Sequence, residues 1–258
     1  MALPLIDTHA HLDEIEDVER AIEEAKSSGV IAIVAVGSDI PSNLKVLELA
    51  ARHPSFIFPA LGLHPWSLPE ANVEEELSFL EAHIKEAVAI GEVGLDYVKS
   101  LVGRVGKERQ KEVFGAILDL ARRSEKPVII HSRYAWRDAF ELTKSKKIRK
   151  AVFHWYTGPL NVLREALREG YFFSCSPAVL YHEEHRRVAK ETPLDKLLLE
   201  TDSPVVYARG TPHEFTSRPS DARRVLEAVA SLKGIQIEEA AIRTTENAIK
   251  LFGLRLKL

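Results

Sequence analysis

The sequence predicts an α/β fold, a single (β/α)8 barrel of the TIM type that covers residues 1–258 as one domain. Three observations lead to this prediction. Short apolar segments of strand length alternate with segments of helical period along the whole chain. The length of 258 residues is close to the roughly 250 residues of such barrels. Histidines and carboxylates follow the predicted strands, at the end of the barrel where this fold carries its sites.

The predicted strands are continuous apolar runs. Residues 30–37 are representative, because the run is rich in β-branched residues and ends at Gly37, as expected for a strand buried on both faces of a parallel sheet. The first strand begins near Leu3 and ends near His11. The other seven are expected at residues 30–37, 56–64, 87–96, 127–133, 150–155, 171–176 and 197–202.

Helices are expected between these strands wherever apolar residues recur with helical spacing. They are predicted at residues 17–28, 41–52, 72–85, 107–124, 136–147, 159–169, 183–191, 220–231 and 238–252. Such alternation means a parallel sheet. An open, doubly wound sheet would alternate in the same way, but no Gly-x-Gly-x-x-Gly follows the first strand, and the strand count favours a closed barrel.

Composition limits the classes of function. The net charge is −3 and the pI is near 6.4, so no global basic field attracts nucleic acid, and any such contact must be local. The one cysteine, Cys175, excludes an intramolecular disulfide and is expected to fill the core. No signal peptide opens the chain, and no apolar run approaches the roughly 20 residues of a membrane span. We therefore expect a soluble, cytoplasmic protein with no membrane contact and no obligate protein partner.

His9 and His11 begin the candidate site. Side chains alternate along a strand, so both imidazoles point to one face and could chelate a transition metal. A lone His-x-His is as often a pair of ordinary strand-end residues. The case becomes stronger because further potential ligands follow later strands. The residues at the carboxyl ends of the predicted strands are His9, His11, His64, Glu92, His131, His154 and Asp202.

These ligands are too numerous for one tetrahedral ion. In a barrel the carboxyl ends of the strands surround one mouth, so residues distant in sequence converge there. Two divalent ions about 3.5–4 Å apart would use such a set, with Glu92 placed to bridge them. Any one of the histidines could be an ordinary structural residue, but a shared position at strand ends favours a metal site.

Several motifs, taken in order, carry a resemblance to a known family. They are His9-x-His11, Gly91-Glu92-Val93-Gly94-Leu95-Asp96, Ile130-His131-Ser132-Arg133, Phe153-His154-x-x-x-Gly158, Glu200-Thr201-Asp202-Ser203-Pro204, Arg209-Gly210 and Thr245-Glu246-Asn247-Ala248. Together they resemble the TatD-like family of metal-dependent deoxyribonucleases, within the amidohydrolase superfamily. Each motif is weak alone, whereas the ordered set spans nearly the whole chain.

The resemblance implies a TIM-type barrel with two divalent ions. His9, His11, Glu92 and Asp202 would hold one ion, and Glu92, His131 and His154 would hold the other. The ligand types suit Zn, Mn, Ni, Fe or Co, and Mg could bind through the carboxylates. Asp202 could take the proton from an activated water, and Glu200 could support the site from behind the ligands.

Substrate contacts are expected around the same mouth. His64 is expected to face it, and Arg133 could grip a phosphate or form a salt bridge with Asp138. Four aromatic residues on mouth loops could stack on a base, although packing is favoured for Trp155. They are Trp66, Tyr97, Trp155 and Tyr156.

The match to the family pattern is incomplete at three places. Ile117 stands where the family commonly has Gln, at a position away from the chemistry. Segments 97–106 and 209–219 also depart from the family pattern, and both are expected at the mouth. The identity of the substrate is therefore the least determined part of the prediction.

Three hypotheses follow. The leading one is a divalent-metal-dependent deoxyribonuclease, an exonuclease that uses a water activated by two ions. The second is a hydrolase of a small ester, lactone or amide from the same superfamily. The third is a barrel that only binds, which the complete set of ligands argues against. The sequence leaves open the metal, the choice between DNA and RNA, the polarity of attack and the oligomeric state.

Overall fold

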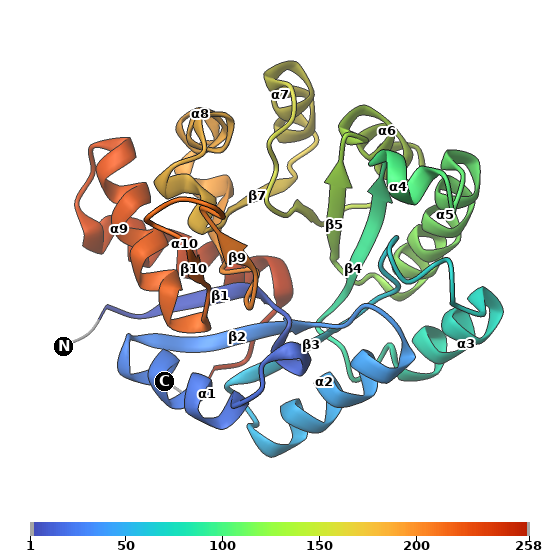
Figure 1. Ribbon diagram of the computed structural model, residues 1–258, viewed down its shortest axis with the longest axis horizontal. Coiled ribbons are helices and arrows are strands. Elements are labelled where there is room, and N and C mark those ends of the chain that lie inside the picture. Colours follow the sequence, from blue (N-terminus) through green and yellow to red (C-terminus); the bar gives the residue numbers. More distant parts are fainter. Residues whose placement is uncertain (1–2, 257–258) are drawn as a thin grey trace.

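The computed structural model of the protein describes residues 3–256 and contains the predicted barrel (Figure 1). Eight parallel strands pair in sequence order, from the first to the eighth. They are β1 (Leu5–Ala10), β2 (Val30–Val36), β3 (Ile57–Leu61), β4 (Ala89–Asp96), β5 (Val128–Arg133), β6 (Ala151–Phe153), β7 (Phe172–Cys175) and β8 (Leu197–Leu199). The predicted fold class is therefore confirmed.

Helices surround the sheet on its outer side (Figure 1). They are α1 (Val18–Ser27), α2 (Ile40–Arg52), α3 (Val73–His83), α4 (Lys99–Val102), α5 (Lys107–Ser124), α6 (Trp136–Ser145), α7 (Leu160–Arg168), α8 (Glu183–Glu191), α9 (Ala222–Lys233) and α10 (Ile237–Phe252). Short 3-10 turns are η1 (Leu12–Glu14), η2 (Pro177–Leu180), η3 (Leu194–Lys196) and η4 (Pro219–Asp221). No helix within residues 3–256 combines the length and apolar character needed to cross a bilayer.

Apolar side chains from all eight strands fill the inside of the barrel. They are Ile6, Ala32, Val34, Val36, Ala60, Ala89, Ile129, Val152, Phe172 and Leu198. Helix α10 joins this cluster through Leu251 and Phe252, and its Asn247 donates hydrogen bonds to the carbonyls of Leu194 and Leu197. The helix thus covers the amino-terminal end of β8, and the carboxyl ends of the strands remain for a site.

The sheet is nearly closed between β1 and β8. Backbone hydrogen bonds join His11 N to the Ser203 carbonyl and Asp202 N to the His9 carbonyl, both at 2.8 Å. The buried Asp7 carboxylate accepts from Thr201, through the backbone N–H at 3.0 Å and the hydroxyl at 2.6 Å. This seam fixes the chain that carries Asp202 against the chain that carries His9.

Several predicted strands end earlier than expected, and β3 ends at Leu61 where the sequence pattern suggested His64. Strand β6 ends at Phe153 and β8 at Leu199, whereas the sequence pattern suggested extensions to Trp155 and Asp202. Trp155 has a φ of 37° and Asp202 a φ of 49°, so both lie in the left-handed region, which a strand does not allow. His154 and Asp202 therefore lie on turns directly after β6 and β8, whereas His9, Glu92 and His131 lie within their strands.

The two segments that depart from the family pattern contain short elements of secondary structure that the sequence did not predict. Residues 97–106 contain the short helix α4, and residues 206–216 form a small antiparallel hairpin of β9 (Val206–Tyr207) and β10 (Phe215–Thr216). Residues 209–219 contain no apolar run or alternation that would predict this pairing.

Candidate metal centre

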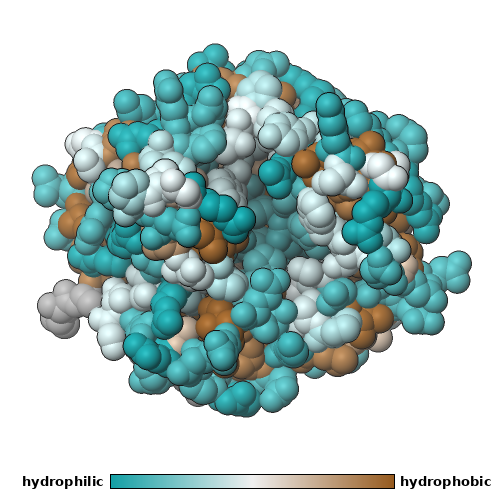
Figure 2. Space-filling view, in the orientation of Figure 1, coloured by the Kyte–Doolittle hydropathy of each residue, from teal (hydrophilic) through white to brown (hydrophobic). Residues whose placement is uncertain are grey.

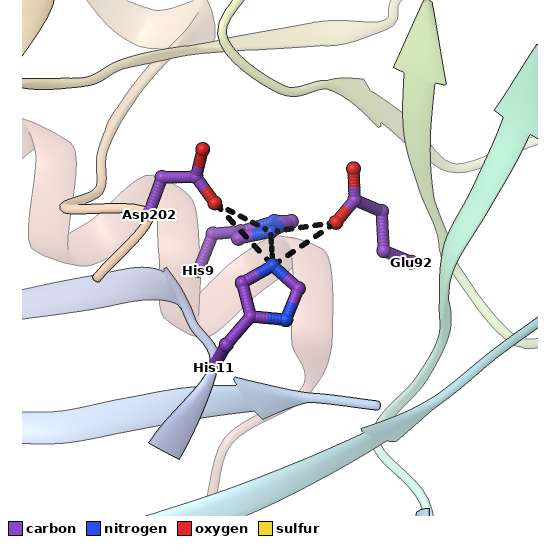
Figure 3. A group of neighbouring side chains, drawn as sticks. All are labelled: His9, His11, Glu92 and Asp202. Atoms are coloured by element: carbon purple, nitrogen blue, oxygen red, sulfur yellow. Dashed lines mark hydrogen bonds and ion pairs between the residues drawn. The ribbon is translucent and has the colours of Figure 1, made fainter. Parts of the chain in front are cut away.

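Four of the predicted ligands form one compact group (Figure 3). Nε2 of His9 and Nε2 of His11 lie 3.4 Å apart. Oε2 of Glu92 lies 3.1 Å from the first nitrogen and 3.3 Å from the second, and Oδ1 of Asp202 lies 3.4 Å from each. Two nitrogen and two oxygen ligand atoms thus converge within 4.8 Å of one another. This donor set fits a divalent transition metal.

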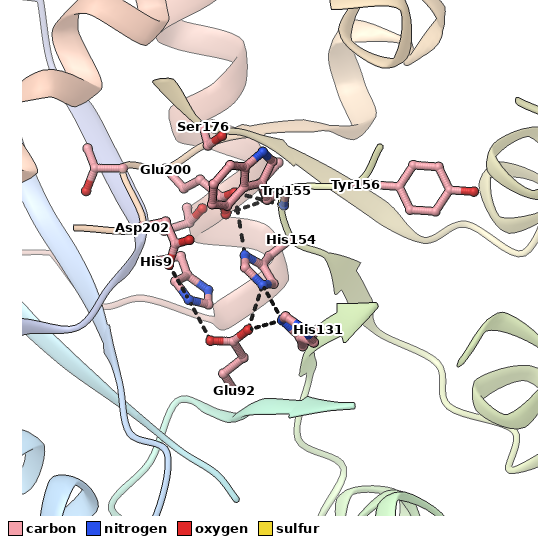
Figure 4. Close-up of polar contacts among 12 residues, drawn as sticks. His9, Glu92, His131, His154, Trp155, Tyr156, Ser176, Glu200 and Asp202 are labelled. Atoms are coloured by element: carbon pink, nitrogen blue, oxygen red, sulfur yellow. Dashed lines mark hydrogen bonds and ion pairs between the residues drawn. The ribbon is translucent and has the colours of Figure 1, made fainter. Parts of the chain in front are cut away.

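The other oxygen of Glu92 faces a second pair of imidazoles (Figure 4). Oε1 of Glu92 lies 2.6 Å from Nε2 of His154 and 2.8 Å from Nδ1 of His131, and these two nitrogens are 3.4 Å apart. Burial raises the pKa of Glu92, but the surrounding imidazoles, above all His154, outweigh it and hold this pKa well below the usual value. Glu92 is therefore an ionised carboxylate between two pairs of histidines.

The glycines around Glu92 allow strands β3, β4 and β5 to approach closely. A Cβ atom on Gly62 would lie 2.4 Å from the carbonyl oxygen of Glu92, and one on Gly94 would lie 2.0 Å from that of His131. Any side chain at these positions would push the neighbouring strand away. The glycines of the motif at residues 91–96 thus set the distance between Glu92 and His131.

His131 is oriented by a residue that sequence reasoning did not single out. Its Nε2 lies 3.0 Å from Oδ2 of Asp96, which is fully buried at the end of β4. Trp66 Nε1 donates to the same oxygen at 2.9 Å, and Val98 N donates to Oδ1 at 2.9 Å. Burial raises the pKa of Asp96, but these hydrogen bonds and the charge of His131 outweigh it and lower the pKa to about 2.

Asp96 therefore decides which nitrogen of His131 is available. An ionised Asp96 accepts the Nε2–H, so in the neutral ring the lone pair of His131 is on Nδ1, which faces Glu92. The spacing offered a signal: Glu92, Gly94 and Asp96 alternate along one strand and share a face.

His64 has the opposite arrangement. The backbone N–H of Trp66 donates to Nδ1 of His64 at 3.2 Å, so the proton of the neutral ring is on Nε2. Nε2 lies 3.4 Å from Oε1 of Glu92. Burial lowers the pKa of His64 and keeps the ring neutral. Proximity alone would group His64 with Glu92 and His131 as ligands, but this tautomer makes its Nε2 a hydrogen-bond donor.

Glu200 supports the site from beneath. Its Oε1 accepts the backbone N–H of Trp155 at 2.9 Å and lies 3.7 Å from Nδ1 of His154. Its Oε2 accepts the hydroxyl of Ser174 at 2.5 Å. Glu200 is fully buried and lies outside the cavity. Its hydrogen bond to Trp155 N holds the turn after β6 in place.

A cavity of about 780 Å³ opens above these groups. A hollow floored by hydrophilic residues is visible near the centre of the molecule in Figure 2. The predicted residues that line it are His11, His64, Glu92, His131, Arg133, His154, Trp155 and Asp202. Its wall also includes aromatic and titratable side chains that the sequence did not indicate, among them Glu14, Tyr134, Trp136, His182 and Glu184.

Arg133 is exposed and lines the cavity. Its expected alternative partner, Asp138, instead binds Lys111 at 2.8 Å and accepts the hydroxyl of Tyr97, also at 2.8 Å. Tyr97 therefore lies outside the cavity, with Lys107 Nζ 4.4 Å from its ring centre.

The other three aromatic residues differ in exposure. Tyr156 is buried, its hydroxyl donates to the carbonyl of Pro159, and its ring points away from the ligands in Figure 4. Trp155 is half-buried against Tyr207, and it also lines the cavity, so the expected packing is only part of its environment. Trp66 is exposed apart from the indole N–H that reaches Asp96.

Known proteins are similar to this chain along nearly its whole length. Residues 6–253 match the family described as "TatD related DNase". The human "Deoxyribonuclease TATDN3" is 34% identical over 261 residues, which are 96% of this chain and 94% of that protein. The "Uncharacterized metal-dependent hydrolase YabD" of Bacillus subtilis is 38% identical over 263 residues, with 97% and 99% covered.

A solved structure is also closely similar. The crystal structure of YJJV, a TatD homologue from Escherichia coli, superposes with a TM-score of 0.90 at 29% identity and covers 99% of this chain and 100% of that one. The motifs, the barrel and these similarities agree along the full length of the fold. The chain belongs to the TatD-related DNase family of metal-dependent hydrolases.

Proposed function

We propose that this protein is a deoxyribonuclease that hydrolyses phosphodiester bonds with two divalent ions. One observation carries the proposal: Glu92 is a buried carboxylate whose two oxygens face separate pairs of imidazoles, His9 with His11 and His131 with His154. A carboxylate with one oxygen toward each set of ligands would be able to bridge a pair of ions. The relatives named above as a deoxyribonuclease and a metal-dependent hydrolase support the same reaction class.

Each ion has a ligand set among these residues. His9, His11, Glu92 and Asp202 would hold the first. Glu92 with Nδ1 of His131 and Nε2 of His154 would hold the second, because Asp96 occupies the other nitrogen of His131. When bound, the ions supply Lewis acidity that acidifies water and stabilises charge on phosphoryl oxygens.

Two side chains of the protein are placed to accept a proton and to donate a hydrogen bond during the reaction. Oδ1 of Asp202 faces His9 and His11, while its other oxygen points away from both rings (Figure 3). That oxygen is placed to accept a proton from the attacking water. Asp202 would therefore act both as a metal ligand and as the general base. His64 carries its proton on Nε2 and can donate it in a hydrogen bond to a phosphoryl oxygen.

The residues in and around the cavity indicate how a substrate would bind. Arg133 is exposed beside the ligands and can bind a phosphate through two parallel N–H groups. Glu200 holds Trp155 and the turn beside His154, so its contribution is to position ligands. Tyr97, bound to Asp138, lies outside the cavity and is not placed for substrate contact.

Exonuclease action fits the size of the cavity. A volume of about 780 Å³ accommodates one or two nucleotides. Duplex DNA needs an extended basic surface, and Arg133 shares the cavity wall with two carboxylates, Glu14 and Glu184. A free strand end meets these constraints better than a duplex interior.

The same acidic residues support a second candidate, the hydrolysis of a small ester, lactone or amide. Glu14 and Glu184 would repel an extended polyanion, whereas they would not repel a small neutral substrate. The metal centre would perform either reaction.

An end-labelled single-stranded oligonucleotide distinguishes the two. Metal-stripped protein is supplied in turn with Mg, Mn, Co and Zn, beside the Asp202→Asn variant. Stepwise shortening that requires both metal and Asp202 supports the exonuclease. If the metal-loaded wild type leaves the oligonucleotide intact yet hydrolyses small esters or lactones, the second candidate replaces the first. Full activity of Asp202→Asn would refute the role given to that carboxylate.

A further inference from the structure

Tyr134 has an unusual backbone conformation beside the site. It follows Arg133 directly after β5, and its φ of 55° lies in the left-handed region. Bulky residues rarely adopt this conformation, which costs on the order of 1–3 kcal/mol and persists where the surrounding structure enforces it. The turn keeps Tyr134 at the cavity wall, with 60% of its surface exposed.

Tyr134 belongs to an aromatic wall. Trp136 and Trp155 also line the cavity, and the Tyr134 and Trp136 rings meet edge to face with centres 5.7 Å apart. Trp155 packs on Tyr207 at 5.1 Å, and both tryptophans are half-buried. Of the three rings, Tyr134 therefore has the most surface free for a ligand, and Trp136 supports its edge.

The charges of the cavity make stacking important. Apart from the ligands of the metal centre, the charged side chains that line it within residues 3–256 are Arg133, Glu14 and Glu184. Arg133 lies next to Tyr134, with its guanidinium carbon 5.8 Å from the centre of that ring. Outside the metal centre one cation can hold one phosphate, so binding of the rest of a nucleotide would depend on uncharged contacts.

We propose that Tyr134 stacks on the nucleobase next to the phosphate held by Arg133, and so selects nucleotides over phosphodiesters that lack a base. This inference rests on the proposed nuclease function and adds a determinant of specificity to it. An aromatic ring stacks on any base, because every base has a π-face. The site would therefore require a base but would not distinguish one base from another.

The test uses one oligonucleotide series. An abasic residue is moved through the terminal nucleotides of each end, and kcat/KM is compared with that of the intact strand. For the wild type, one position should lower kcat/KM about 5- to 150-fold, the range expected for one base–aromatic stack. Tyr134→Ala should lose the same factor on the intact strand, chiefly through KM, and should then be insensitive to the abasic residue.

Two variants control for other effects. Tyr134→Phe keeps the ring and should retain wild-type discrimination. Tyr181 is also an exposed tyrosine, with 47% of its surface accessible, but it lies outside the cavity, so Tyr181→Ala should behave as the wild type.

The outcomes separate the two proposals. If the wild type cleaves the strands but no abasic position matters, or if Tyr134→Ala still responds to the missing base, the stacking role is refuted while the nuclease function stands. If the wild type cleaves none of the strands with any metal, the nuclease function is refuted, and the stacking role is refuted with it.

Discussion

Replacing Asp96 with Asn tests how the proposed second ion would be held. Three donors converge on this carboxylate: His131 and Trp66 on Oδ2, at 3.0 Å and 2.9 Å, and Val98 N on Oδ1 at 2.9 Å. An asparagine offers one acceptor oxygen, and its NH₂ group must face at least one of the three donors. In either amide orientation a buried N–H loses its partner.

The expected magnitudes follow from that count. One unpaired buried donor should lower the free energy of unfolding by about 1–3 kcal/mol. Loss of the partner that orients a ligating imidazole should weaken metal binding about 10- to 100-fold. The loss should fall on the ion held by His131 and His154, while the ion held by His9 and His11 should bind as in the wild type.

Calorimetric titration of metal-free protein with Co or Zn, together with urea unfolding, measures both quantities. Trp66→Phe is the matched control, because it removes one donor and leaves the carboxylate on His131, so its effect on metal affinity should be smaller. Wild-type affinity for both ions in Asp96→Asn, or an equal loss at both, would refute the reasoning that Asp96 selects the ligating nitrogen of His131.

Two further predictions concern packing and pH. Gly62→Ala should destabilise the protein and reduce metal content, because its Cβ would meet the backbone of Glu92 at 2.4 Å, whereas Gly106→Ala meets nothing within 4 Å and should be tolerated; equal unfolding curves would contradict this. His185 is buried between Ser176 N and the Tyr156 carbonyl, and burial lowers its pKa to about 4. The unfolded chain therefore binds a proton first, and stability present above about pH 6.5 should fall by roughly 3 kcal/mol as pH drops to 4. In His185→Gln this part of the pH dependence should disappear, and an unchanged slope would contradict it.

The convergence of the candidate ligands could be predicted because it depends on topology. Parallel strands end at one mouth, so a pattern of strands followed by His, Glu or Asp suffices to bring His9, Glu92 and Asp202 together without knowledge of any side-chain conformation. The same argument located His64 and Arg133 at the cavity.

The remaining features depend on turns and on contacts between segments. Tyr134 is at the wall because its φ is positive, and the sequence has no glycine there to signal this. Tyr97 was expected at the mouth, but its hydroxyl reaches Asp138 on α6 instead. The place of Asp96 depends on Trp66, which lies 30 residues earlier and approaches only in the folded barrel.

The most direct test of the central claim is to count and place the ions. A crystal structure of the metal-loaded protein, with anomalous data at the absorption edge of Zn or Co, would show both. We predict two ions about 3.5–4 Å apart, bridged by Glu92, with Nδ1 of His131 on the second. A single ion, or a second ion bound by Nε2 of His64 in place of His154, would contradict it.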